Sequence, residues 1–314
     1  MSALAAPPRP APDREGLAPP LARADLLRSL GILVEAPAPG HAAIAAALGL
    51  PGTPGPGDHA DVFLFATYPY ASVYLGAEGM LGGEARDRIA GFWRAVGLTP
   101  PAEPDHLTVL LAMYAALLER EVAAPTESQR IAARHARGAF LWEHLVSWLP
   151  AWLAKVEELA PPYHAAWAGV LREALDGEAA ETGEPAVLPL ALRAAPALPD
   201  DAAPAADWIA ALLAPVRSGV ILTRWDLRRA GIELGLGSRA GERAFMLRSL
   251  LEQDPTGVSD WLTTEAARAA DDHAERATRH GPVAEFWRQR AEACRAALLR
   301  VRPGQGKVEP NDGD

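Results

Sequence analysis

The sequence predicts an all-α protein, and three observations carry that prediction. Apolar residues recur at spacings of three and four along most of the 314 residues, which is the period of helices that bury one face. Runs of alternating β-branched residues, which would indicate strands, are missing. Hydrophobic residues make up 49% of the chain and charged residues 22%, which is ordinary globular usage and excludes wholesale disorder.

The expected helices follow one another along the chain. They span residues 21–34, 41–48, 83–95, 105–121, 127–149, 152–175, 224–234, 239–252 and 283–301. The Pro/Gly-rich segment 51–57 forces a loop, and the apolar stretch 62–74 after it is interrupted at Pro69. Pro150 falls within the apolar stripe that begins at Leu141, so the helix there should kink or split.

Capping residues mark three of the helix starts. Thr126, with Gln129 three residues later, fits a capping box, in which each side chain binds a backbone N–H that the helix leaves free. Thr223 and Asp226 have the same spacing. Asp105 stands directly before an apolar run and is expected to be an N-cap.

Composition divides the chain into five stretches. We expect a disordered lead-in over 1–20, a helical domain over 21–175, a linker over 176–206, a helical region over 207–302 and a polar tail over 303–314. The linker prediction rests on Gly, Pro, Ala and acidic residues without a period. No signal peptide is recognisable, and the longest apolar run is far shorter than the ~20 residues that span a bilayer. We therefore expect a soluble cytoplasmic protein.

Charge and cysteine content exclude several classes of function. The chain has 30 Lys+Arg against 40 Asp+Glu, a net charge of −10, which argues against a general nucleic-acid coat. The single cysteine, Cys294, excludes internal disulfides and Cys-cluster metal sites. Phosphate-loop, dinucleotide-binding, nucleophile-elbow and HExxH motifs are absent from the sequence. We expect no catalysis, no metal and no cofactor.

The segment Glu103-Pro104-Asp105-His106 admits two interpretations. In the first, Pro104 sets a turn, Asp105 caps the helix and His106 lies in its first turn, with no further function. In the second, two carboxylates and an imidazole at an exposed helix start receive a cationic peptide, because arginine pairs bidentately with carboxylates. Composition alone favours the first interpretation, although both can hold at once.

Three short segments stand in an order that resembles a known family. They are Y-A-S-V-Y-L at 70–75, E-P-D-H-L at 103–107 and F-L-W-E-H-L-V-S-W-L-P at 140–150. Their order is similar to that of the TorD/DmsD/NarJ family of redox-enzyme maturation chaperones, over about residues 21–175. The resemblance implies a TorD-like helical bundle, here with a helical C-terminal extension. It also implies a cytoplasmic chaperone without a cofactor of its own.

The resemblance further implies a client and a peptide site. Family members bind the apo-subunit of a molybdopterin-containing oxidoreductase, or its twin-arginine signal peptide, before cofactor insertion. The matching residues are Glu103, Pro104, Asp105, His106, Tyr74, His144 and Trp148. We expect Glu103 and Asp105 to engage the arginines of the signal and Tyr74 to hold its apolar stretch. The sequence leaves the oligomeric state open, and the 176–206 linker would permit a homodimer formed by exchange of elements.

The C-terminal region supports an alternative hypothesis. Residues 217–248 contain seven arginines and three acidic residues, a local balance of +4 within an acidic protein. Two short helices around a Gly-Leu-Gly turn, with that charge, fit a DNA-binding regulator of the helix-turn-helix type. Such arginines are more often a solvated face or partners of nearby acids. The same region could instead dock onto the acidic first part of the chain or onto a client subunit.

Overall fold

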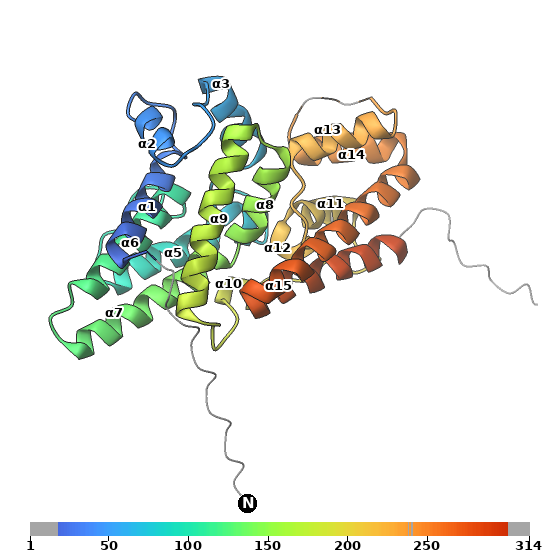
Figure 1. Cartoon of the computed structure of the whole chain (residues 1–314). Coiled ribbons are helices and arrows are strands. Elements are labelled where there is room, and N and C mark those ends of the chain that lie inside the picture. Colours follow the sequence, from blue (N-terminus) through green and yellow to red (C-terminus); the bar gives the residue numbers. More distant parts are fainter. Residues whose placement is uncertain (1–17, 238, 240, 301–314) are drawn as a thin grey trace, which may run out of the picture.

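The computed structural model describes residues 18–237, 239 and 241–300, and within them the chain forms helices and no extended strand (Figure 1). The all-α prediction is confirmed. The α-helices are α1 (Pro20–Ile32), α2 (His41–Ala47), α3 (Pro56–His59), α4 (Ala71–Leu75), α5 (Gly83–Ala95), α6 (Leu107–Val122), α7 (Glu127–Phe140), α8 (Leu149–Leu159), α9 (Pro162–Thr182), α10 (Leu190–Arg193), α11 (Ala205–Leu213), α12 (Pro215–Ser218), α13 (Arg224–Glu233), α14 (Arg243–Gln253) and α15 (Pro255–Arg300). Two π-helices, η1 (Ala60–Ala66) and η2 (Leu141–Val146), complete the set. Residues 1–17 of the predicted lead-in and the predicted tail 303–314 lie outside the described residues.

The expected break near Pro150 is present. Helix α7 passes into the π-helix η2, and α8 then begins at Leu149. Pro150 lies in the first turn of α8, where a residue without an N–H costs no helical hydrogen bond. The sequence therefore places the interruption correctly.

The largest difference from the predicted helices is at α15. The prediction covered only residues 283–301, whereas the helix begins at Pro255 and is kinked at Gly281, whose φ is 46°. The first part of α15 buries small side chains such as Ala266 and Ala270, which give a weak apolar period. The helical pattern was missed there for that reason.

The predicted linker 176–206 begins too early. Helix α9 continues to Thr182, and Glu178 within it is 2% exposed. The Glu178 carboxylate accepts a hydrogen bond from the Tyr114 hydroxyl at 2.7 Å and lies 2.7 Å from Nε of Arg23. These contacts join α9 to α6 and α1. Residues 176–182 are thus part of the helical packing, and only 183–189 and 194–204 lack helices.

The buried apolar residues form two clusters. The larger joins α1, α6, α8 and α9, and the smaller joins α11, α13, α14 and α15. We call α1–α10 the N-terminal lobe and α11–α15 the C-terminal lobe; their division into separate domains stays a prediction. Trp287 of α15 belongs to the larger cluster, and its Nε1 donates to the carbonyl of Ser147 at 2.9 Å. Helix α15 therefore packs against both cores, and it contacts α9 (Figure 1).

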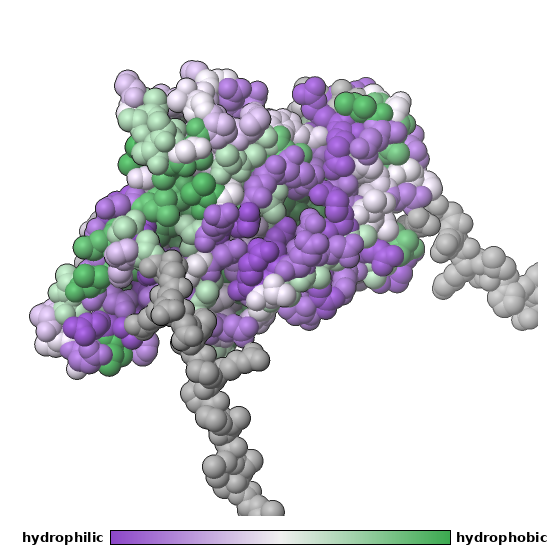
Figure 2. All heavy atoms as spheres, viewed as in Figure 1, coloured by the Kyte–Doolittle hydropathy of each residue, from purple (hydrophilic) through white to green (hydrophobic). Residues whose placement is uncertain are grey.

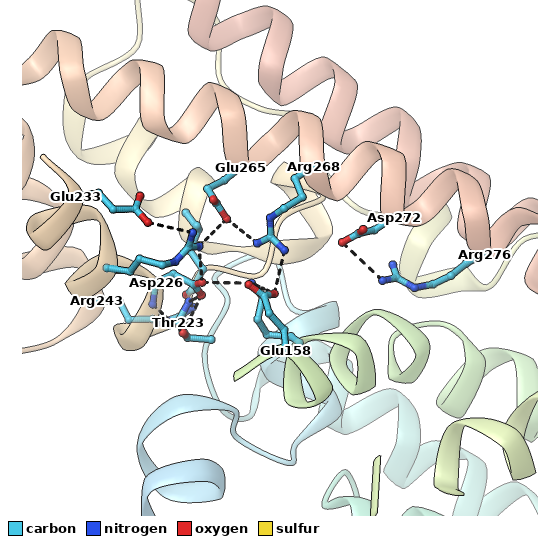
Figure 3. A network of polar contacts seen from close by, with 12 residues as sticks. Glu158, Thr223, Asp226, Glu233, Arg243, Glu265, Arg268, Asp272 and Arg276 are labelled. Carbon is cyan, nitrogen blue, oxygen red and sulfur yellow. Dashed lines mark hydrogen bonds and ion pairs between the residues drawn. The ribbon is translucent and has the colours of Figure 1, made fainter. Parts of the chain in front are cut away.

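A network of charged side chains also joins the lobes (Figure 3). Lys155 Nζ of α8 lies 3.3 Å from the Asp226 carboxylate of α13. Nearby, Glu158 of α8 pairs with Arg268 of α15 at 3.0 Å. The Asp226 side chain is fully buried, so its pair with Lys155 is shielded from salt.

Among the described helices, none combines the length and apolar character needed to cross a membrane.

Candidate functional site

Residues 103–106, here called the acidic turn, precede α6 and are held against the start of α4. The backbone N–H of Ala71 donates to the Asp105 carbonyl at 3.0 Å, and that of Leu107 donates to the Pro69 carbonyl at 2.8 Å. Tyr70 and His106 thereby form an isolated antiparallel bridge. This pairing fixes the turn before helix α6 begins.

Asp105 does not cap α6, so that prediction is wrong. The N-cap is His106, which makes no side-chain capping bond. The Asp105 carboxylate is 2% exposed and accepts from the backbone N–H of Ser72 at 3.4 Å. The reason is the backbone bridge, because it turns Asp105 toward α4 one residue before the N-cap position. Asp105 holds two segments together under the surface.

Glu103 and Glu35 give the acidic turn its accessible negative charge. Both residues are exposed. The Tyr70 hydroxyl donates to Glu103 Oε2 at 3.1 Å, and burial together with this bond raises the pKa of Tyr70 to about 12. Tyr70 is thus a neutral donor at physiological pH.

His106 lies between these groups. Its ring is 4.8 Å from that of Tyr70, and its Nδ1 is 3.8 Å from Oε1 of Glu35. Burial lowers the pKa of His106, although the nearby Glu35 and Glu103 carboxylates oppose that shift. The imidazole is therefore mainly neutral at pH 7, and the charge of this surface is set by Glu35 and Glu103.

The other expected site residues lie in the core. Tyr74 is stacked on Trp148 with ring centroids 5.2 Å apart, and its hydroxyl donates to the Tyr68 carbonyl at 2.9 Å. Trp148 is 0% exposed, and its Nε1 donates to the His144 carbonyl at 2.9 Å. His144 is buried, which lowers its pKa to about 4. These three side chains and Pro104 are buried, while Glu103 is exposed and His106 is partly exposed.

Two exposed apolar side chains lie on η1, the helix that precedes Tyr70 in the sequence. Leu64 and Phe65 are 52% and 50% exposed, and η1 ends four residues before Tyr70. The π-helix ends at Thr67, whose N–H and hydroxyl both donate to the Val62 carbonyl.

The face of the molecule in Figure 2 is hydrophilic along α9 and α15, and its hydrophobic residues gather over α1 and α2. The surface along α9 and α15 on that face is therefore a poor place for an apolar segment.

The arginines of residues 217–248 are partly engaged within the protein. Arg217 donates to the Ala197 carbonyl, and Arg229 pairs with Asp226 at 3.2 Å and with Glu265 at 2.9 Å. Arg243 donates to two backbone carbonyls. Fewer of the seven arginines are left to bind DNA than the composition suggests.

In the part of the chain that the structure describes, no group of three or more His, Cys, Asp or Glu residues could hold a metal ion.

The sequence was compared with known proteins. Residues 57–154 match a family model described as nitrate reductase delta subunit. Two curated relatives, each named "Chaperone protein TorD" and coming from Vibrio vulnificus strains YJ016 and CMCP6, are 31% identical over 111 residues. These matches cover 32% of this chain and 51% of each relative.

Over residues 57–154 this chain is therefore similar to the TorD/NarJ family. The chain spans about half the length of the curated relatives it matches. The segment matched by the family model contains η1, α4, the acidic turn and α6. It ends at residue 154, so the charged network and the whole C-terminal lobe lie outside it.

Sequence reasoning missed several residues at the acidic turn. Tyr70 lies within a motif that was noticed, but its bond to Glu103 spans 33 positions. Glu35 lies after the end of the first helix and has no motif around it. Exposed Leu64 and Phe65 belong to an apolar stretch that periodicity alone assigns to the core. No sequence signal available from one chain separates these from buried neighbours.

Proposed function

We propose that this protein is a redox-enzyme maturation chaperone that binds a molybdopterin oxidoreductase precursor in the cytoplasm, without bond making of its own. Its client is the apo-subunit or the twin-arginine signal peptide of that subunit. The observation that carries the proposal is the acidic turn, where exposed Glu103 and Glu35 flank a mainly neutral His106. The match of residues 57–154 to the nitrate reductase delta subunit model and the similarity to curated TorD chaperones support the same function.

Paired arginines suit this surface. A guanidinium presents a planar fork of donors that fits a carboxylate bidentately, and it is more easily desolvated than an ammonium. Glu103 and Glu35 each offer one such acceptor, and Tyr70 orients the first of them. Asp105 acts beneath the surface by holding the turn against α4. In this proposal Tyr74, His144 and Trp148 support the site and do not contact the peptide.

The apolar segment of the signal needs an apolar surface within reach of the acidic turn. We propose that exposed Leu64 and Phe65 on η1 provide it. Burying a large apolar side chain contributes about 1.5–3 kcal/mol, which is enough to matter for a peptide that is ordered only on binding. π-Helices are frequent at functional sites, which fits a role for η1.

Binding of a synthetic twin-arginine peptide tests this function. We expect calorimetry to show binding that weakens with salt and weakens about tenfold when Glu103→Gln removes one carboxylate. A Lys-Lys peptide should bind more weakly than the Arg-Arg peptide. Glu173→Gln, at an exposed glutamate of α9, is the matched control and should leave affinity unchanged. Equal affinity of the wild type and Glu103→Gln would overturn the role of the acidic turn.

The oligomeric state is a separate proposal. Residues 183–189 connect α9 to α10 without helix and permit exchange of elements between two copies. Light scattering at several protein concentrations would detect such a dimer. A monomer at all concentrations would remove this proposal and leave the peptide site untouched.

A further inference from the structure

We propose that Arg243, in the C-terminal lobe, is a positioning residue for the acidic turn, so that the C-terminal helices set the affinity for the client peptide. The inference rests on the proposed function only for the identity of the ligand. The structural part of the inference is a series of contacts that runs from Arg243 of α14 to Asp105 of the acidic turn. It extends the site beyond the residues that the family model matches.

Arg243 is the first residue of α14 and reaches across to the N-terminal lobe. One guanidinium nitrogen, Nη2, donates to the Gly79 carbonyl at 3.0 Å. The other, Nη1, donates to the Leu222 carbonyl within its own lobe, also at 3.0 Å. Figure 3 shows Arg243 at the edge of the charged network, beside Thr223. One side chain thus ties a loop of the first lobe to the backbone of the second.

The surroundings of Arg243 differ from those of an arginine in a stabilising ion pair. Its hydrogen bonds among the described residues go to backbone carbonyls, and burial lowers its pKa. A cation placed this way loses hydration without gaining a carboxylate partner, so it is a poor source of net stability. Its two carbonyl bonds fix a geometry, because the planar fork holds both acceptors at set positions.

Gly79 shows how closely the lobes approach at this loop. Its φ is 63°, and a Cβ at this position would lie 2.8 Å from the carbonyl oxygen of Leu213 and 2.9 Å from Cα of Ala214. Only glycine fits such a position without displacing backbone. The loop 76–82 is therefore packed against the end of α11 as well as bound by Arg243.

The same loop is bonded to the acidic turn through Ser72. The N–H of Gly82 donates to Ser72 Oγ at 3.0 Å, and the N–H of Ser72 donates to the Asp105 carboxylate at 3.4 Å. The Asp105 carbonyl in turn accepts from Ala71. A contiguous path of hydrogen bonds and one short loop thus links Arg243 to the residue that holds the acidic turn. Such packed, hydrogen-bonded networks are the kind through which coupling between sites travels.

The test compares Arg243→Ala with Arg248→Ala. Arg248 is an exposed arginine of the same helix and serves as the matched control. We expect Arg243→Ala to weaken twin-arginine peptide binding about tenfold, within the range of typical coupling between sites. Arg248→Ala should change it less than twofold. Arg243→Lys should restore part of the loss, because an ammonium can still reach one carbonyl.

Two further measurements separate positioning from general stability. Hydrogen exchange of the Ser72 and Gly82 amides should accelerate in Arg243→Ala while amides of α6 stay protected. The Arg243→Ala and Glu103→Gln losses in affinity should be less than additive, since both act on one site. Gly79→Ala, which displaces the same loop while keeping the Arg243 side chain, should reproduce both effects even where Arg243→Ala fails to fold.

The outcomes distinguish this inference from the proposed function. Unchanged exchange at Ser72 and Gly82 in a folded Arg243→Ala variant would overturn the positioning role, whatever the peptide does. Peptide affinity within twofold of the wild type in that variant would also overturn it. A wild-type protein that binds no twin-arginine peptide would defeat the proposed peptide site, and the exchange experiment would still decide whether Arg243 positions the acidic turn.

Discussion

His164 is a buried residue whose hydrogen-bonding capacity is left unused. It is 1% exposed and packs against the ring of Phe63 at 5.3 Å, and neither ring nitrogen finds a partner among the described residues. A buried polar group without a partner costs about 1–3 kcal/mol. We predict that His164→Leu raises the free energy of unfolding by about 1 kcal/mol, as measured by urea denaturation.

Its control is His135→Leu. His135 is exposed, so this variant should stay within about 0.5 kcal/mol of the wild type. A clear loss of stability in His164→Leu, with no change in the control, would contradict the prediction and indicate that the imidazole is satisfied by bound water.

Three buried imidazoles give the protein a defined dependence on pH. Burial lowers the pKa of His144, His164 and His273 to about 4 in each case. In the unfolded chain a histidine titrates near 6.5, so between about pH 6.5 and 4 the unfolded state binds protons that the folded state does not. Their contribution to stability is complete above pH 6.5 and is lost as the pH falls toward 4.

We therefore predict that the free energy of unfolding decreases by about 3 kcal/mol for each of these three histidines from pH 7 to pH 4, since each pKa unit is worth about 1.4 kcal/mol per group. Urea midpoints at pH 7, 6, 5 and 4 measure the slope. The slope should be shallower in His164→Leu, which removes one of the three groups. The same slope in that variant and the wild type would show that His164 does not contribute.

At the scale of helices, the two predicted capping boxes differ in burial. Thr223 is 2% exposed; its hydroxyl donates to Asp226 Oδ2 at 2.8 Å and accepts from the Asp226 N–H at 3.2 Å. Thr126 is exposed and accepts from the Gln129 N–H at 3.3 Å. We predict that Thr223→Ala lowers the free energy of unfolding by about 2 kcal/mol and Thr126→Ala by about 0.5 kcal/mol. Equal losses in urea denaturation would show that burial of the cap does not matter here.

Local chemistry explains which helix boundaries the sequence could predict. Thr126, Pro150 and Thr223 act on neighbouring residues, so their effects were readable from spacing alone. The position of Asp105 is set by a tertiary contact, because backbone pairing with residues 69–71 overrides its capping preference. The first part of α15 escaped prediction because alanine gives little amphipathic contrast.

At the scale of the whole molecule, the sequence predicts only those residues of the candidate site that lie within one segment. Glu103 and His106 belong to one segment, so the sequence could name them together. Tyr70 and Glu35 join them only through the fold. The contact between Arg243 and Gly79 spans 164 positions, and no spacing in the sequence signals it. Tyr74 and Trp148 match family motifs but are buried and stacked on each other, and motif matching alone cannot separate packing from binding.

Contacts between the lobes lead us to expect that the lobes unfold together. Trp287 of α15 lies in the core of the N-terminal lobe, and Lys155 of α8 is paired with the fully buried carboxylate of Asp226 in the C-terminal lobe. Removing one partner of a buried pair leaves an uncompensated charge and typically costs 3–5 kcal/mol. Asp226 keeps its bonds to Thr223 and Arg229, which favours the lower end of that range.

We predict that Lys155→Met lowers the free energy of unfolding by about 3 kcal/mol and that the chain still unfolds in one transition. Circular dichroism during urea denaturation gives the stability, and hydrogen exchange in α6 and α14 reports the two lobes separately. Arg288→Met, which breaks partly exposed pairs with Glu285 and Glu292 on α15, is the control and should cost less than about 1 kcal/mol. If α14 lost protection in Lys155→Met while α6 kept its own, the lobes would be independent. The charged network would then stabilise only the C-terminal helices, and Arg243 could not transmit their state to the acidic turn.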